Sequence, residues 1–190
     1  MAKPQPYRAT VAVPLPEHDV AREVVGADYD PLTTLNVVRM MAGTGDMFSG
    51  LVGMVRAVFG ADGIDARHRE VIILRAAVVL DSPYEWQANE KMAANAGLTP
   101  AEIDAIAADG AVQGIADDYV LLCRAADEMY GATHTLADET LSDLLETFGA
   151  DLTRKYITTI AWFSLLSLFL NATRVPLEVT DKIGDRTSPL

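Results

Sequence analysis

The fold is decided by residues 64–102, which read IDARHREVIILRAAVVLDSPYEWQANEKMAANAGLTPAE. This stretch predicts two consecutive helices joined by a short turn. Asp65 suits the N-cap of the first helix, which becomes apolar from Val71 to Leu80, with only Arg75 interrupting. A helix that is apolar on so many sides must be surrounded by other parts of the protein. We therefore expect this helix to lie at the centre of the core.

The turn after the first helix carries the signals that begin a second one. Ser82 is a good N-cap residue, a proline follows it, and Glu85 comes three residues after the cap. This S-x-x-E pattern predicts a capping box, in which the Glu85 carboxylate bonds back to the Ser82 amide. Asn89 lies one turn beyond Glu85 on the same face. Gly97 is expected to end the helix, and residues 99–102 predict a second capping box.

Glu70 and Glu85 are the strongest candidates for chemistry. Each lies near the start of a core helix, where a carboxylate costs free energy unless it has a partner or a task. The alternative for Glu85 is the capping role alone. The alternative for Glu70 is an ion pair with an arginine, for which the sequence offers Arg67, Arg69, Arg75 and Arg174.

Three motifs in this stretch carry a family resemblance. They are R-E-x-x-I-L-R at residues 69–75, Y-E-W at residues 84–86 and A-x-x-A-G-L-T-x-x-E-I at residues 93–103. Through them the chain resembles the carboxymuconolactone decarboxylase and alkylhydroperoxidase (AhpD-like) family, more loosely over residues 36–178. The resemblance implies an all-α, AhpD-like multi-helix bundle that is usually assembled into trimers or hexamers. It also implies that Glu70 and Glu85 reach one pocket.

The chain departs from this family at two positions that matter for chemistry. The AhpD-like branch resembles a thiol peroxidase with C-x-x-C at the start of the second helix, where this chain has Ser82 and Glu85. The decarboxylase-like branch has Y-E-W-x-x-H, and Asn89 stands at the histidine position. An amide forms hydrogen bonds but cannot carry a proton at neutral pH. Both the redox pair and the histidine acid or base are therefore missing.

Asn89 and four further residues complete the candidate site. Asn89 is either an exposed helix residue or a hydrogen-bond donor that polarises a substrate carbonyl. Tyr84 and Trp86 flank Glu85, either as ordinary core residues or as aromatic walls that exclude water and raise its pKa. The remaining candidates for substrate contact are Ser82 and His68. His68 lies two residues before Glu70 and so points to a different face of the helix.

The hydrophobic content and the net charge of the chain indicate which classes of molecule it binds. The chain has 190 residues, which suits one domain, and 50% of them are hydrophobic, which indicates that another subunit covers some apolar surface. With 27 acidic against 15 basic residues, the net charge is -12. Phosphate backbones and anionic lipids repel such a chain, so we expect no nucleic-acid and no membrane partner. The expected partners are a small-molecule substrate and further copies of the chain.

Cysteine and ligand patterns point to no cofactor. Cys123 is the single cysteine and lies in an apolar helical patch, which predicts a buried and unreactive thiol. The sequence shows neither zinc-type Cys/His spacing nor a glycine-rich phosphate loop, so no metal is expected. The N-terminal residues lack an apolar run long enough for a signal peptide, which favours a cytoplasmic location.

The chain divides into an arm, one helical domain and a tail. Residues 1–30 form the N-terminal arm, extended over its proline-rich first part, residues 31–178 the helical domain, and residues 179–190 the C-terminal tail. Outside the central pair, helices are predicted over residues 31–41, 46–59, 101–108, 117–130, 136–148 and 151–173. The last one is apolar but carries several hydroxyl side chains, which favours a core helix over a membrane span.

Two functions from different classes follow from these residues. The first is a non-redox lyase or isomerase for a small lactone or oxo acid, with Glu85 as proton donor, Asn89 on the developing oxyanion and Glu70 as base or orienting group. The second is a catalytically inactive helical oligomer that serves as a binding protein. Residual hydroperoxide reduction is disfavoured because it needs a paired thiol.

Overall fold

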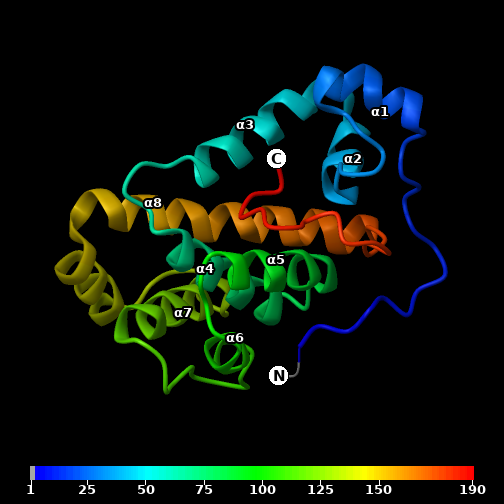
Figure 1. The fold of residues 1–190 in the computed structure, drawn as a ribbon. Helices are drawn as coiled ribbons and strands as arrows, with labels where there is room; N and C mark the ends of the chain where they lie inside the picture. The colour runs from blue at the N-terminus through cyan, green and yellow to red at the C-terminus, as the bar shows by residue number, and fades with distance from the viewer. Residues whose placement is uncertain (1–2) are drawn as a thin grey trace.

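The structure, a computed structural model, describes residues 3–190 and is all-helical over that range (Figure 1). Two short 3-10 turns, η1 (Gly26–Asp28) and η2 (Gly45–Met47), accompany the α-helices. The α-helices are α1 (His18–Val25), α2 (Asn36–Ala42), α3 (Phe48–Phe59), α4 (Ala66–Val79), α5 (Pro83–Asn95), α6 (Pro100–Ile106), α7 (Asp117–Tyr130) and α8 (Asp138–Thr173). No strand occurs within residues 3–190. The predicted all-α fold class is confirmed.

Helix α4 is the central element, as its sequence predicted. It packs against α5, α6, α7 and α8, and nearly all of its residues from the second turn onward are buried. Val71 and Leu74 face a core shared with α6 and α7. Ile73 and Ala76 face a second core shared with α2 and α3. Because α4 has buried side chains in both cores, it provides a fixed surface against which α5 and α8 pack.

Helix α8 is two helical segments joined at a break. Gly149 has φ 73° and ψ 167°, a backbone conformation that interrupts the helix and is open mainly to glycine. This break lies where the sequence predicted one helix to stop and another to begin.

Among residues 3–190, α8 is also a helix long and apolar enough to cross a membrane by length and composition, with 44% of its most apolar window buried.

The N-terminal region differs from its prediction. Residues 3–17 are extended, as expected of the proline-rich arm, but the helix α1 follows within the range assigned to the arm. The helix predicted from residue 31 begins only at Asn36. The reason is a local turn: the Asp30 side chain accepts a hydrogen bond from the Leu32 amide at 2.8 Å, and the Thr34 hydroxyl accepts one from the Asp30 amide at 3.0 Å.

Arg75, the charge that interrupts the apolar run of α4, ties three elements together. Its side chain is 2% exposed and forms two bonds to Asp127 on α7, with Nε–Oδ1 at 2.5 Å and Nη2–Oδ2 at 2.8 Å. The remaining donors reach backbone carbonyl groups at the end of α6, those of Ile106, Ala108 and Gly110. This buried cation is therefore fully bonded and connects α4, α6 and α7.

We expect Asp127→Asn to lower the free energy of unfolding by about 1–3 kcal/mol, because it removes the charge that balances a buried guanidinium. Urea denaturation measures the change. Asp143→Asn is the matched control, since Asp143 pairs with Arg124 where both side chains are exposed, at 44% and 40%. The control is expected to change stability by less than about 1 kcal/mol. Equal losses in the two variants would contradict the importance given to the Arg75 network.

Candidate functional site

The start of α5 positions Glu85, but not by the predicted capping box. The Ser82 side chain makes no cap hydrogen bond, and the Ser82 amide donates instead to the Ala77 carbonyl at 2.8 Å. That amide closes the end of α4 and is not available to the Glu85 carboxylate. The capping box is therefore wrong for Glu85, although the one predicted over residues 99–102 is confirmed. Glu85 therefore does not cap helix α5, which was the main alternative to a catalytic role for this residue.

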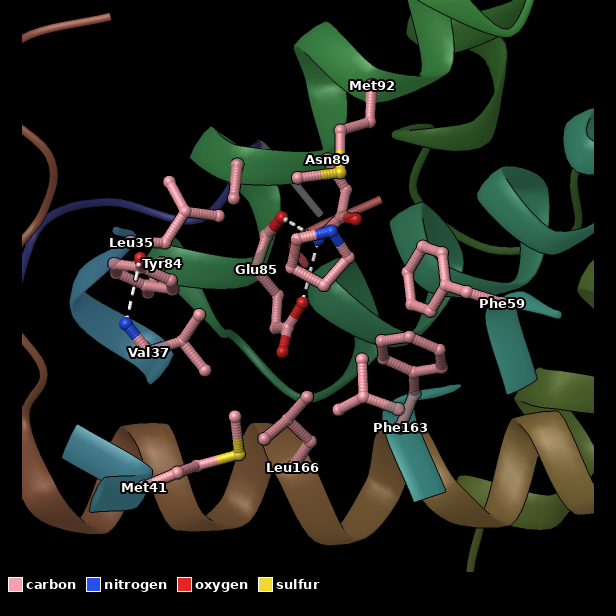
Figure 2. A pocket seen from close by; sticks show the side chains of 13 residues that line it. Leu35, Val37, Met41, Phe59, Tyr84, Glu85, Asn89, Met92, Phe163 and Leu166 are labelled. Atoms are coloured by element: carbon pink, nitrogen blue, oxygen red, sulfur yellow. Dashed lines mark hydrogen bonds between the residues drawn. The ribbon is translucent and has the colours of Figure 1, made fainter. Parts of the chain in front are cut away.

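Glu85 lies in a closed, apolar cavity (Figure 2). The cavity has a volume of about 20 Å³, which is room for about one water molecule. Helices α2, α3, α5 and α8 supply most of its lining, together with the residue before α2 and one residue of the C-terminal segment. The lining residues are Leu35, Val37, Met41, Val55, Phe59, Tyr84, Ala88, Asn89, Met92, Phe163, Leu166 and Pro189. Figure 2 shows the Glu85 side chain pointing in among Leu166 and Phe163.

The environment of Glu85 favours its protonated form. The residue is 4% exposed, and burial raises the pKa of its carboxyl group to about 8, with the hydrogen bond from Asn89 acting in the opposite direction. Asn89 Nδ2 donates to Glu85 Oε2 at 2.7 Å. Oε1 is buried and has no hydrogen-bond partner among the described residues. At neutral pH Glu85 is thus a carboxylic acid with one oxygen free.

Asn89 holds Glu85 in this orientation. Its Nδ2 group also donates to the Glu85 backbone carbonyl at 2.9 Å, so both amide hydrogens are used within α5. The prediction that Asn89 donates to a substrate carbonyl does not match this geometry. The buried amide instead fixes the rotamer of Glu85, which makes Asn89 a positioning residue.

Glu70 is a second buried carboxyl group close to the first. It is 0% exposed, its Oε1 lies 3.3 Å from Arg69 Nε, and its Oε2 has no partner within residues 3–190. Burial raises the pKa of Glu70 to about 8; Arg69 opposes that shift and the charge of Glu85 adds to it. The two carboxyl groups are therefore within electrostatic reach. The resemblance implied that Glu70 and Glu85 reach one pocket, but Glu70 does not line the cavity, which Glu85 shares with Asn89.

Three of the other predicted residues lie around the first turn of α5 in different roles. Tyr84 lines the cavity with its ring, while its hydroxyl donates to Glu178 Oε1 at 2.5 Å and accepts from the Val37 amide at 3.0 Å. Trp86 packs into the other core, with Lys3 Nζ 5.2 Å from the ring. Ser82 is fully buried and does not line the cavity. Of these three, only Tyr84 borders the space beside Glu85.

His68 lies away from this cavity. Its Nδ1 is 2.7 Å from the Tyr156 hydroxyl and its Nε2 is 2.9 Å from Asp118 Oδ2. The reason is helical geometry: two residues correspond to about 200° around a helix, so His68 and Glu70 face opposite sides of α4. The substrate contact predicted for His68 at this site has no geometric support.

The ion pair of Glu70 with Arg69, one of the four arginines that the sequence offered, is present at 3.3 Å. Sequence reasoning did not place Arg69 itself in the site, and it did not anticipate Pro189. Arg69 is 5% exposed, and its guanidinium carbon lies 4.4 Å from the centre of the Phe59 ring. Pro189 belongs to the predicted tail, yet it lines the cavity beside Glu85. The R-E pair in the first family motif could have drawn attention to Arg69. No local pattern marks Pro189.

Cys123 confirms the expectation of a buried thiol. It is 0% exposed on α7, and burial raises the pKa of the thiol to about 12.

Within residues 3–190, no group of three His, Cys, Asp or Glu side chains is arranged to hold a metal ion. The lining residues bring one carboxyl group, that of Glu85, to the cavity; the Glu70 carboxyl and the Arg69 guanidinium are not part of the lining.

Comparison with known proteins gives a family match over part of the chain and a shared fold. The sequence pattern of the carboxymuconolactone decarboxylase family matches residues 45–128. No curated protein is similar enough in sequence to match the chain. Among solved structures, an uncharacterized peroxidase-related protein from Ralstonia eutropha JMP134, described as an alkylhydroperoxidase AhpD core, superposes with a TM-score of 0.74 at 18% identity, over 95% of this chain and 99% of that one.

A debrominase, Bmp8, is also similar in structure. Its apo form has a TM-score of 0.65 at 16% identity, over 91% of this chain and 95% of that one. A cysteine-to-alanine variant of Bmp8 in complex with 2,3,4-tribromopyrrole has a TM-score of 0.65 at 16% identity, over 90% and 94% of the two chains. At such low identity these structures establish a shared fold and leave the activity open.

Proposed function

We propose that the protein is a non-redox, proton-transferring enzyme for a small carbonyl compound. The premise is that residues 45–128 match the sequence pattern of the carboxymuconolactone decarboxylase family and that the chain shares the fold of an AhpD core. The observation that supports the proposal is Glu85. Its carboxyl group is buried, protonated at neutral pH and free at one oxygen beside an apolar cavity. Such a group is suited to general acid catalysis at pH 7.

The proposed reaction is loss of carbon dioxide from an oxo acid or an unsaturated lactone acid. The bond between the carboxylate carbon and its neighbour breaks, its electron pair moves onto the conjugated carbonyl as an enolate, and carbon dioxide leaves. Glu85 then delivers its proton to the carbon, which gives the neutral product and the Glu85 carboxylate. A proton from solvent restores the acid, so the net change consumes one proton and releases one carbon dioxide.

Asn89 and Glu70 support this step without touching the substrate. The Asn89 amide holds Glu85 Oε2, so that Oε1 is the oxygen free to act. Glu70 is a second protonated carboxyl group within electrostatic reach of the first, and ionisation of either makes ionisation of the other less favourable. Because two adjacent charges are disfavoured, the Glu85 carboxylate formed in each turnover keeps Glu70 in its neutral form.

The test is a proton-exchange assay in D₂O. Small oxo acids and unsaturated lactone acids are incubated with the protein and followed by NMR. The expected result is loss of carbon dioxide and one deuterium on the carbon that carried it. If neither product formation nor deuterium exchange occurs for any member of the panel, the proposal is contradicted.

The activities of the structural neighbours are less well supported in this chain. A dithiol peroxidase reaction needs two cysteines, and this sequence has one, Cys123, which is buried on another helix. Bmp8 supports a different point, because it is solved in complex with 2,3,4-tribromopyrrole, a small ring compound. That complex is consistent with a small cyclic substrate for the fold.

The alternative function, a catalytically inactive binding protein, has one observation in its favour. The cavity of about 20 Å³ holds no more than about one water molecule, so no substrate fits beside Glu85 unless part of the lining moves. The D₂O assay separates the two functions, because a binding protein produces no exchange.

We also propose that the protein is a homo-oligomer, as its hydrophobic composition predicts, and that it is located in the cytoplasm. The outward face of α8 supports assembly, because Leu165 and Leu168 are 49% and 58% exposed and lie one turn apart. Sedimentation equilibrium tests the trimer or hexamer that the family resemblance implies.

A further inference from the structure

The C-terminal segment, residues 176–190, lies along the candidate site. Asn95 Nδ2 on α5 donates to the carbonyl groups of Gly184 at 3.0 Å and Arg186 at 2.8 Å. The Glu178 amide donates to Gln87 Oε1 at 2.8 Å. In Figure 1 the segment, coloured red, passes in front of α8 and ends below α3. These contacts hold the segment against α5, and its end reaches the cavity that contains Glu85.

The tip of this segment fills space at the site. The Thr187 carbonyl accepts a hydrogen bond from Arg69 Nη2 at 3.0 Å. Pro189 lines the cavity that contains Glu85, and it also lines a neighbouring hollow of about 320 Å³ beside Arg56. Pro189 is therefore a shared wall between a water-sized cavity and a space large enough for a small molecule.

Arg69 is a buried cation whose contact with a carboxyl group, Glu70 Oε1 at 3.3 Å, is long. It is 5% exposed, and at neutral pH its neighbour Glu70 is largely protonated because its pKa is raised to about 8. Its contact with the Phe59 carbonyl is long, at 3.5 Å, so the neutral Thr187 carbonyl is its best oxygen partner. A carboxylate oxygen in that place would form a stronger, charge-assisted hydrogen bond.

We propose that residues 187–190 occupy a ligand site, and that the ligand which displaces them is a small organic anion with a compact, largely apolar ring. Its carboxylate takes the position of the Thr187 carbonyl on Arg69, and its ring takes the position of Pro189 beside Glu85. The segment then acts as an internal competitor. The affinity measured for the ligand falls with the fraction of molecules in which the segment is displaced. This inference rests on the proposed function for taking the Glu85 cavity as the site.

The experiment measures binding of 2-furoate, a five-membered ring with one carboxylate, to full-length protein by titration calorimetry. Pro189→Gly removes the ring that fills the cavity and is expected to bind 2-furoate about tenfold more tightly than the unaltered protein. Arg69→Gln, introduced alone or with Pro189→Gly, is expected to weaken binding at least about tenfold, because it removes the charge that holds the carboxylate. The neutral 2-furamide is expected to bind about tenfold more weakly than 2-furoate.

Arg67→Gln is the matched control, since Arg67 is exposed, pairs with Asp65 and lies two residues from Arg69. It is expected to leave 2-furoate binding unchanged. If Arg69→Gln does not fold, Arg69→Lys replaces it and is expected to weaken binding several-fold, because an ammonium does not reproduce the planar guanidinium. Equal affinity of the unaltered protein and Pro189→Gly, equal affinity for 2-furoate and 2-furamide, or undiminished binding by Arg69→Lys overturns the proposal.

The same titration separates this inference from the proposed function. Glu85→Gln is expected to keep 2-furoate binding, because the glutamine amide leaves Arg69 and the space of Pro189 intact. Absence of turnover together with the expected binding pattern contradicts the enzyme and leaves the ligand site standing. Turnover without the Pro189 and Arg69 effects contradicts the ligand site and leaves the enzyme standing.

Discussion

Glu85→Gln is expected to lower turnover by about 10²–10⁴-fold, the range that general acid catalysis contributes. The glutamine amide has nearly the size and shape of the protonated carboxyl group, but it has no proton that it can transfer at neutral pH. Its oxygen can still accept the hydrogen bond that Asn89 now donates at 2.7 Å. The variant therefore separates the chemical role of Glu85 from its place in the packing. The rate of carbon dioxide release and of deuterium incorporation measures the loss.

Two controls make this result specific. Glu90→Gln changes a partly exposed glutamate of the same helix, which pairs with Lys3 at 2.8 Å, and is expected to retain full turnover. Thermal unfolding of Glu85→Gln at pH 7 is expected to show no loss of stability, because a neutral amide replaces a neutral acid. Full turnover by Glu85→Gln would assign the proton transfer to another group, with Glu70 the first to examine.

The free energy of unfolding is expected to fall as the pH rises from about 5 to about 8, the second large effect. Burial raises the pKa of both Glu70 and Glu85 from 4.5 to about 8 in the folded protein. Below pH 4.5 both states of the protein are protonated at these groups, so they contribute no pH dependence. Between the two values the unfolded chain releases protons that the folded chain retains, so rising pH favours unfolding. The slope is about 1.4 kcal/mol per pH unit for each group, and it vanishes above the folded pKa.

Urea denaturation at a series of pH values tests this dependence. The double variant with Glu70→Gln and Glu85→Gln is expected to show a nearly flat profile over the same window, and to exceed the unaltered protein in stability most clearly near pH 8. Surface carboxylates act in another range, because ion pairing lowers the pKa of Asp65 and Asp181 and their contribution is lost only in acid. Parallel profiles for the double variant and the unaltered protein would show that neither glutamate is buried as a neutral acid.

Periodicity and breaker residues were sufficient to predict most of the helices. The apolar run of α4 has no polar side wide enough to face water, which is why it had to lie at the centre. Gly149 marks the break in α8, since a glycine backbone reaches a conformation that stops a helix. Helix α1 is amphipathic, with Ala21 buried and Val24 and Val25 beside it. It was missed because its eight residues lie within the range assigned to the N-terminal arm, directly after the proline-rich stretch.

Local rules were less reliable at the site. Both S-x-x-E and T-x-x-E predicted capping boxes, but only the second formed. The difference is that only Leu80 and Asp81 separate Ser82 from α4, so that its amide closes the preceding helix by bonding to the Ala77 carbonyl. The capping rule considers one helix at a time. It does not account for a residue such as Ser82, which is the N-cap of α5 while its amide bonds to the end of α4.

By itself the sequence determined the all-α fold, the central helix and the placing of Asn89 one turn after Glu85, because these depend on residues a few positions apart. Only the tertiary structure decided which polar groups lost their water and what lies over them. The bond between Arg69 and Thr187 joins residues 118 positions apart, and the partners of His68 are 50 and 88 positions away. Burial and charge pairing depend on many such neighbours that are distant in sequence. Local residue spacing therefore could not predict the raised pKa of Glu85 or the C-terminal segment that lines its cavity.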